Sequence, residues 1–183
     1  MLNELFFALW FFLPAGIANG TPVIANKIPL LNKWRTPMDF DKSFRGKRIF
    51  GQNKTWRGLI FSSLIAGLTG LVTYLLYDDY FASLGLDPSS PALAASGLGV
   101  LLGCGALLGD AVESFFKRQL GKRPGELWFP FDQIDFIIGG LLVVAPFVRL
   151  SWIQLLLIGV VWFVSHLIWA YIGYLLKLKD API

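Results

Sequence analysis

The chain has 183 residues, of which 55% are hydrophobic and 15% aromatic, while only 15% carry a charge. A soluble domain usually has about 25% charged residues, so this composition argues against one and predicts an integral membrane protein. The formal net charge is +4, and the single cysteine, Cys104, excludes a disulfide framework and a cysteine metal site. We expect residues 1–183 to form a single transmembrane domain.

Five apolar segments approach the roughly 20 residues that are needed to cross a bilayer. They cover about residues 5–25, 59–77, 92–111, 134–148 and 152–176. The first contains Pro14 and Pro22, which predict a broken helix. The third contains Gly99 and Gly103, a small-residue pair that permits close contact between helices. The predicted fold class is an all-α polytopic membrane protein with about five transmembrane helices and two polar loops.

The charges of the connections predict the orientation. Residues 26–57 contain nine Lys and Arg against two Asp, and residues 113–133 contain four Lys and Arg. Residues 78–91 contain Asp78, Asp79 and Asp87 but no Lys or Arg. By the positive-inside rule, the loops at about 26–57 and 113–133 and the C-terminus are cytoplasmic, and the N-terminus lies outside. The basic residues from Lys27 to Arg48 are interpreted as an anchor for anionic lipid head groups.

The third apolar segment becomes polar without an obvious end to its helix. Asp110, Glu113, Ser114 and Lys117 follow i, i+3, i+4, i+7 spacing, which places them on one helical face. Arg118 lies one turn beyond Ser114. A carboxylate at the membrane edge followed by two cations is typical of a site for a metal ion and a phosphate.

Asp132 and Asp135 lie three residues apart at the start of the fourth apolar segment. Either one alone is compatible with a cap at a helix N-terminus. Together with Asp110 they favour a divalent metal site, because acids at a membrane edge are costly and usually functional. Glu113 and Glu126 are interpreted instead as solvated or salt-bridging groups.

The sequence GQNKTWRG covers Gly51–Gly58 and ends the first polar loop. Its side chains Asn53, Lys54, Thr55 and Arg57 offer donors to a polyphosphate or a base. The spacing of a Walker A loop is absent. The alternative for this stretch is a basic anchor that contacts lipid head groups.

These motifs resemble a known family. The pattern G-D-x-x-E-S-x-x-K-R, followed by Lys122, Pro124–Gly125 and D-x-x-D, resembles the C-terminal signature of the CTP:phosphatidate cytidylyltransferases. N-K-T-W-R-G resembles their N-K-T-W-E-G segment. The chain most resembles the archaeal branch of this family, the CDP-archaeol synthases. It shares with them its small size, its predicted spans and the sequence P-F-D-Q-I-D-F.

The resemblance implies a transferase that converts CTP and 2,3-bis-O-(geranylgeranyl)-sn-glycerol 1-phosphate to CDP-archaeol and pyrophosphate, with Mg²⁺ as cofactor. It implies metal ligands at Asp110 and Asp132 and a further essential acid at Asp135, which the residue pattern adds to the expected metal ligands. With Lys117 and Arg118 these three aspartates form the expected catalytic set. The implied nucleotide-binding residues are Asn53, Lys54, Thr55, Arg57, Lys117, Arg118 and Lys122. The implied partners are CTP, the prenylated glycerol phosphate and membrane lipids, without nucleic acid. The broken first helix is expected to help form the lipid groove.

The family pattern fails at one place. The bacterial enzymes have P-G-H-G-G before D-x-x-D, whereas this chain has a shorter connection, Pro124–Pro130, to which no role is assigned. The implied location is the cell membrane, with several crossings and a cytoplasmic active site.

Two alternatives remain from the residues alone. One is an enzyme resembling the CDP-alcohol phosphotransferases, whose aspartate pattern is not found. The other is a small cation-coupled transporter, which predicts acids near the middle of the bilayer rather than at segment ends.

Overall fold

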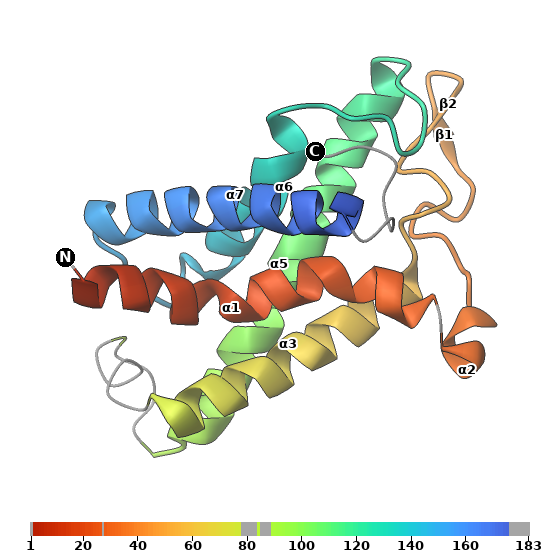
Figure 1. The fold of residues 1–183 in the computed structure, drawn as a ribbon. Coiled ribbons are helices and arrows are strands. Elements are labelled where there is room, and N and C mark those ends of the chain that lie inside the picture. Colours follow the sequence, from red (N-terminus) through yellow and green to blue (C-terminus); the bar gives the residue numbers. More distant parts are fainter. Residues whose placement is uncertain (1, 27, 78–83, 85–88, 176–183) are drawn as a thin grey trace.

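The computed structural model is mostly helical and describes residues 2–26, 28–77, 84 and 89–175. Its elements in chain order are α1 (Leu2–Ala25), α2 (Pro29–Asn32), β1 (Ser43–Phe44), β2 (Lys47–Arg48), α3 (Trp56–Leu76), α5 (Pro91–Gln119), α6 (Phe131–Val144) and α7 (Trp152–Leu175) (Figure 1). Four helices, α1, α3, α5 and α7, are long and apolar enough to cross a membrane. Asp78, Asp79, Asp87, Lys27 and the tail after residue 175 lie outside the described residues.

The fourth predicted span is shorter than expected. α6 has 14 residues, which extend about 21 Å at 1.5 Å per residue, less than the roughly 30 Å hydrocarbon core of a bilayer. The helix starts earlier than predicted, at Phe131, and ends at Val144. Pro146 lies just beyond this end, where a proline cannot continue the helix.

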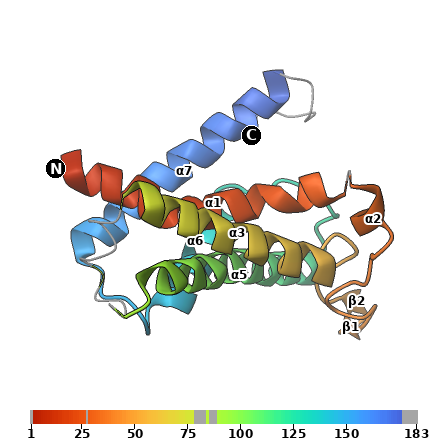
Figure 2. The ribbon, with the colours of Figure 1, turned by 90° about the horizontal axis from the view of Figure 1, so that it is seen from below.

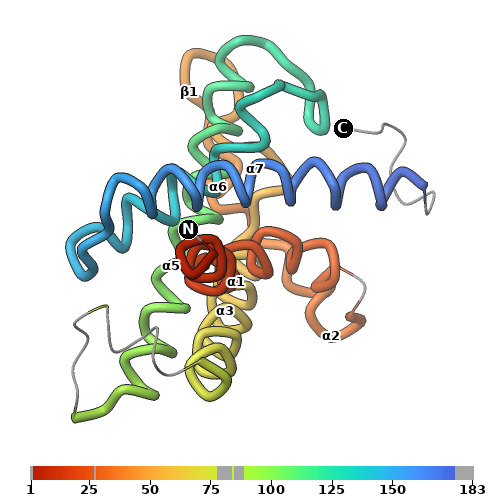
Figure 3. The backbone as a smooth tube through the Cα atoms, turned by 60° about the vertical axis from the view of Figure 1, so that its left-hand side comes forward, coloured from red at the N-terminus to blue at the C-terminus, as the bar shows by residue number. Residues whose placement is uncertain are grey.

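The prediction of a broken first helix is wrong. α1 is continuous from Leu2 to Ala25 and contains both Pro14 and Pro22. Gly16 faces α7, where a Cβ would overlap the ring of Trp162. The indole Nε1 of Trp162 donates to the carbonyl oxygen of Ala8 at 3.0 Å. In Figure 3 the N-terminal part of α1 is seen nearly end-on, with α7 above it and α3 below it. Gly16 therefore serves close helix packing.

α5 continues through residues 113–119 to Gln119, which confirms that the third apolar segment stays helical as it becomes polar. The helix ends at Gln119, and Gly121, just after its C-cap Leu120, has a φ of 82°, which suits glycine. The amide of Lys122 donates to the carbonyl of Lys117 at 3.0 Å, and that of Gly121 to Arg118 at 3.1 Å. These two bonds form a Schellman motif, which satisfies the last carbonyl groups and turns the chain back toward α6.

Glycines bring both neighbours of α5 into backbone contact with it. A Cβ at Gly99 or Gly103 would overlap Ala66 of α3, which confirms the predicted close contact (Figure 2). On the other side, a Cβ at Gly109 would overlap the carbonyl oxygen of Asp135. A Cβ at Gly139 would likewise overlap Gly105. α6 is thus held against α5 at a distance that only glycine permits.

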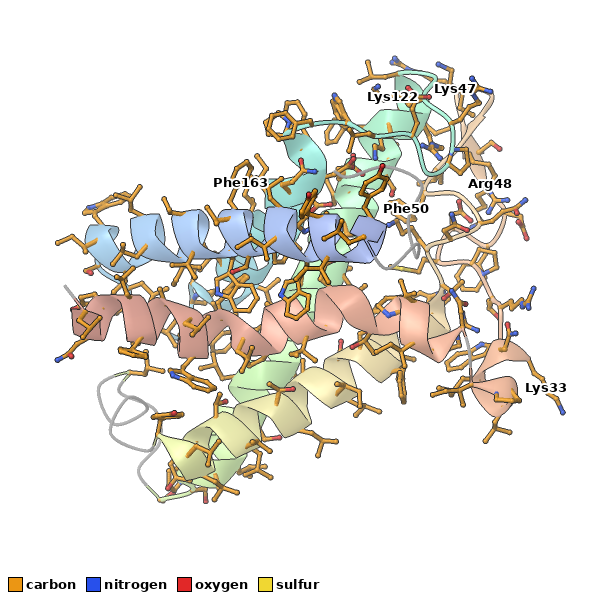
Figure 4. All side chains as sticks on the ribbon, in the orientation of Figure 1. Lys33, Lys47, Arg48, Phe50, Lys122 and Phe163 are labelled. Carbon is orange, nitrogen blue, oxygen red and sulfur yellow. The ribbon has the colours of Figure 1, made fainter. Side chains whose placement is uncertain are left out.

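The first polar segment folds onto the end of α5. β1 and β2 form an antiparallel hairpin, and its turn at Arg45–Gly46 has positive φ at both residues, as a tight hairpin turn requires. Lys47 Nζ donates to the carbonyl oxygen of Gln119 at 2.6 Å. The rings of Phe44 and Phe115 lie 6.0 Å apart. Figure 4 shows Lys47 beside Lys122 at this end of the molecule.

Substitution of Gly109 tests the contact between α5 and α6. We expect Gly109→Ala to lower the free energy of unfolding by about 1–3 kcal/mol, because the added methyl group overpacks the interface. Thermal unfolding in detergent micelles measures the loss. Gly97→Ala is the control in the same helix, since no described atom lies within 4 Å of its Cβ position. An equal loss in both variants would contradict this description of the contact.

Candidate functional site

Three carboxylates gather where α5 and α6 meet. Ligand oxygens of Asp110, Glu113 and Asp135 all lie within 4.8 Å of one another. α5 supplies Asp110 and Glu113 one turn apart, and α6 supplies Asp135, whose backbone packs on Gly109. Glu113 is buried, with 7% of its surface exposed. The helix contact therefore assembles the cluster from two separate segments.

This cluster fits a divalent cation. Carboxylate oxygens are the donors that Mg²⁺ prefers, and a cation would offset the mutual repulsion of the three acids. Among the described residues, Glu113 Oε1 is buried and accepts no hydrogen bond, although Lys117 Nζ lies 3.2 Å away. An acceptor left open beside two further carboxylates is what a metal site offers.

Glu113 has a different environment from the one expected for a solvated or salt-bridging group. The salt bridge to Lys117 is present, but the side chain is buried rather than solvated and belongs to the acidic cluster. The i, i+3 spacing from Asp110 was the available signal. Glu126, in contrast, is a salt-bridging group as expected, since its Oε1 lies 3.0 Å from Lys122 Nζ.

Asp132 lies beside the cluster rather than among its three members. Its Oδ1 accepts a hydrogen bond from Lys117 Nζ, and its Oδ2 accepts from the backbone N–H of Trp128 at 2.7 Å. Asp132 thus links the cation of α5 to the turn that precedes α6. Its predicted role as a metal ligand remains a prediction.

The cations of the site come from two polar segments. Lys54 Nζ donates to Asp110 Oδ2 at 2.5 Å, across 56 residues of sequence. Lys117 pairs with Asp132 and Glu113. The guanidinium group of Arg118 donates to the carbonyl oxygen of Arg123 at 2.9 Å. Each of the two lysines therefore pairs with at least one carboxylate of the site.

A polar cavity of about 180 Å³ lies among these groups. Its lining residues are Phe50, Gly51, Gln52, Asn53, Lys54, Asp110, Glu113, Ser114, Lys117, Arg118, Pro124, Gly125 and Asp132. The four residues that the sequence placed on one face of α5 all contribute. The cavity also joins the GQNKTWRG stretch to the acids, which are far away in sequence.

Three predicted nucleotide-binding residues lie outside this cavity. Thr55 Oγ1 accepts from the N–H of Gly58 at 3.1 Å and so caps α3. Arg57 is buried and donates to the carbonyl oxygen of Leu31 at 3.1 Å. Both line a second polar cavity of about 610 Å³ on the other side of Asn53.

Lys122 is the third of these residues. Its Nζ donates to Glu126 Oε1 at 3.0 Å in the connection between α5 and α6. The structure thus assigns Lys122 a contact within this connection and does not bring it to the acids.

The segment Pro124–Pro130 closes the site. Pro124 and Gly125 line the polar cavity. The ring of Trp128 packs on Phe131 with centroids 4.4 Å apart, and Phe129 lies against Phe163 of α7 at 6.2 Å. This shorter connection therefore supplies a wall of the cavity and the N–H group that holds Asp132.

An apolar groove of about 570 Å³ reaches the acids from the other direction. It is lined by Gly105, Leu108, Gly109, Val112, Glu113, Phe116, Trp128, Phe131, Ile134, Asp135, Ile138, Gly139, Leu142 and Val143. This groove lies between α5 and α6, and α1 contributes no residue to it. α1 lines a separate cavity of about 420 Å³ that reaches Asp110, through Asn19, Pro22 and Val23, so its expected part in a lipid groove stays a prediction. Glu113 lines both the groove and the polar cavity.

Asp39 organises the segment that carries Lys54, although it belongs to none of the sequence motifs. The carboxylate accepts from Arg48 at 2.7 Å and from the N–H groups of Phe50 and Gly51, each at 3.0 Å. Burial alone would raise the pKa of Asp39, but the hydrogen bonds from Arg48, Gly51 and Phe50 outweigh it, so the pKa lies below its usual value. The carboxylate therefore stays ionised at neutral pH. Its stabilising effect is lost only as the pH falls through this lowered pKa.

A family model, curated relatives and a solved structure all point to the same family of membrane enzymes. Residues 1–183 match the family model of CarS-like CDP-archaeol synthase. The CDP-archaeol synthase of Pyrococcus abyssi is 35% identical over 182 residues, 99% of each chain. That of Methanocaldococcus jannaschii is 36% identical over 181 residues, 96% of each chain. A solved structure of an intramembrane enzyme for archaeal membrane lipids biosynthesis is similar with a TM-score of 0.69 and 28% identity, and the match covers 88% of this chain and 90% of that one.

Cation binding tests the acidic cluster. We expect the full-length protein in detergent to bind Mn²⁺, used as a paramagnetic probe, and Glu113→Gln to weaken this binding by at least about 10-fold. Electron paramagnetic resonance of the free Mn²⁺ measures the affinity. Glu126→Gln is the control, because Glu126 lies in the connection after α5 and pairs with Lys122. Equal affinities of the wild type and Glu113→Gln would contradict the assignment.

Proposed function

The chain belongs to the CDP-archaeol synthase family, and on this premise we propose that it transfers the cytidylyl group of CTP to a prenylated glycerol phosphate in the membrane. The substrate is 2,3-bis-O-(geranylgeranyl)-sn-glycerol 1-phosphate, and the products are CDP-archaeol and pyrophosphate. Family membership decides against the transporter and against an enzyme of the CDP-alcohol phosphotransferase kind. Residues 1–183 act as a single domain.

One observation carries the proposal: the acidic cluster lies where a polar cavity meets an apolar groove. Glu113 faces both spaces, Asp110 lines the polar cavity, and Asp135 lines the groove. The reaction joins a water-soluble nucleotide to a lipid, so its centre must be open to both phases. The prenyl chains occupy the groove, and CTP enters the polar cavity.

The cations of the polar cavity bind the triphosphate. Lys54, Lys117 and Arg118 reach it from two segments, and the planar guanidinium group of Arg118 suits two-point contact with phosphate oxygens. Asn53 adds a neutral donor and acceptor at the edge toward the larger polar cavity. This larger cavity, with Thr55 and Arg57, receives the nucleoside.

The chemical step is a displacement at the α-phosphorus of CTP. An oxygen of the lipid phosphate forms the new P–O bond, the bond to the β-phosphate breaks, and pyrophosphate leaves. The nucleophile is already an anion at neutral pH, so the chain needs no strong general base. Its task is to bring two anions together, and Lys117 and Arg118 reduce their repulsion and orient the line of attack.

Asp110, Glu113 and Asp135, with Asp132 next to them, hold a divalent cation, for which we propose Mg²⁺. When bound, it supplies charge neutralisation for the phosphates. Lys54, which pairs with Asp110 at 2.5 Å, lines the polar cavity and would contact the triphosphate from there. Asp132 keeps Lys117 in place through its bond to that ammonium group.

The site faces the cytoplasm in a protein that crosses the membrane several times. The starts of α1 and α7 lie at one end of the molecule, and α2 and the hairpin lie at the other (Figure 1). The basic residues of the first polar segment belong to the second of these ends, which the positive-inside rule places in the cytoplasm. The N-terminus is outside, and α6 with the turn up to Val148 completes the fifth crossing.

Product formation tests the function. The full chain in lipid nanodiscs, given CTP labelled at the α-phosphate, Mg²⁺ and the prenylated glycerol phosphate, is expected to yield a labelled CDP-lipid and pyrophosphate. We expect Asp110→Asn and Asp132→Asn to lower kcat on the order of 10²-fold or more, because each removes charge from the reaction centre. Thin-layer chromatography of the lipid extract measures the product.

Lys33→Gln is the control for this assay. Lys33 belongs to the same basic segment but points away from the bundle at α2 (Figure 4). We expect its activity to equal that of the wild type. Absence of product from the wild type, or aspartate variants as active as the wild type, would overturn the proposal.

A bulky substitution in the apolar groove tests whether the prenyl chains bind there. Val112 lies in the groove and half of its surface is exposed, so Val112→Trp is expected to raise the KM for the lipid phosphate about 10-fold and to leave the KM for CTP unchanged. Leu68→Trp, at an exposed position of α3, is the matched control. Steady-state kinetics with each substrate varied in turn measures both constants. The same KM for the lipid phosphate in both variants would place the prenyl chains elsewhere.

A further inference from the structure

We propose that Asp39 is a positioning residue for CTP, whose buried carboxylate holds the segment Gly51–Lys54 as a wall of the polar cavity. The inference rests on the proposed function, because it names CTP as the ligand. Asp39 lies outside every motif of the sequence, and it does not line the polar cavity itself. Its effect on the nucleotide therefore passes through the backbone that it binds.

The carboxylate of Asp39 accepts a network of hydrogen bonds from the backbone and from Arg48. Oδ2 accepts from the N–H groups of Phe50 and Gly51, each at 3.0 Å, and from Arg48 Nε at 3.2 Å. Oδ1 accepts from the second guanidinium nitrogen of Arg48 at 2.7 Å and from the N–H of Asp41 at 3.1 Å. Only 4% of Asp39 is exposed. Two backbone donors of one turn thus depend on a single ionised group.

This turn leads directly into the cavity. Gly51 has a φ of 98°, which glycine adopts without strain, and its carbonyl oxygen accepts from the N–H of Lys54 at 3.4 Å. The carbonyl oxygen of Lys54 accepts from the N–H of Met38, next to Asp39, at 2.8 Å. Both ends of Gly51–Lys54 are therefore hydrogen-bonded to the turn around Asp39, and Lys54 Nζ reaches Asp110 from this segment.

The neighbouring Asp41 provides a control that distinguishes the positioning role of Asp39 from a general effect of negative charge near Arg48. Asp41 lies 2.7 Å from the same guanidinium group of Arg48, but 71% of its side chain is exposed. The N–H groups of Phe50 and Gly51 both donate to Asp39 and not to Asp41. Asp39→Asn and Asp41→Asn each remove one charge next to Arg48, and only the first disturbs the turn.

Equilibrium binding of CTP to the full chain tests the proposal without turnover. With Mg²⁺ present and the lipid substrate absent, isothermal titration calorimetry gives the Kd for CTP. We expect Asp39→Asn to raise this Kd on the order of 10-fold, as the loss of hydrogen bonds to a charged acceptor implies. Asp41→Asn is expected to change it by less than about 3-fold, because exposed ion pairs contribute little.

Kinetics distinguishes positioning from a loss of fold. We expect Asp39→Asn to raise the KM for CTP and to leave the KM for the lipid phosphate unchanged, whereas general destabilisation would impair both together. If Asp39→Asn does not yield folded protein, Arg48→Gln replaces it. That variant removes the two guanidinium hydrogen bonds that hold the carboxylate of Asp39 toward the N–H groups of Phe50 and Gly51. It is expected to raise the Kd for CTP by more than the roughly 3-fold bound set for Asp41→Asn.

Each outcome is decisive. A Kd for CTP in Asp39→Asn equal to that of the wild type, or an equal rise in Asp39→Asn and Asp41→Asn, overturns the positioning role while the cytidylyltransferase stands. In the replacement series, an unchanged Kd in Arg48→Gln does the same. A wild type that neither binds CTP nor forms product overturns both proposals.

Discussion

The backbone contact between α5 and α6 is the constraint on which the site depends. Gly109 and Gly139 let the two helices approach until their main chains touch, and only at this distance does Asp135 reach Asp110 and Glu113. The same contact sets the position of Asp132 at the start of α6. Helix packing in membranes relies on small residues of this kind, and here the packing also decides which charges become neighbours.

Bringing carboxylates together at a membrane edge requires compensation, and the chain supplies it from both polar segments. Lys54 pairs with Asp110 and Lys117 with Asp132. These ion pairs stabilise the partly buried charges at the junction of α5 and α6, since an unpaired charge in such a site is costly.

The sequence predicted the helices that have strong hydropathy and the residues that share a helical face. Asp110, Glu113, Ser114 and Lys117 follow from spacing within one helix, and the structure confirms their common face. α6 was predicted too long and α1 was predicted broken, because hydropathy and prolines do not reveal which neighbours pack on a helix. Asp39 and the contact of Lys122 with Glu126 depend on how loops fold back, for which a single sequence has no periodic signal.

The contacts of α5 have a consequence for biosynthesis. A chain emerges from the ribosome with its N-terminal part first, so the hairpin and Lys54 leave the ribosome well before their partners. Gln119, the hydrogen-bond partner of Lys47, is synthesised 72 residues after it. Asp110, the partner of Lys54, is synthesised 56 residues after it. Asp135 follows later still. During translation the first polar segment therefore lacks these partners until α5 has been made, and the acidic cluster is complete only after α6 has followed.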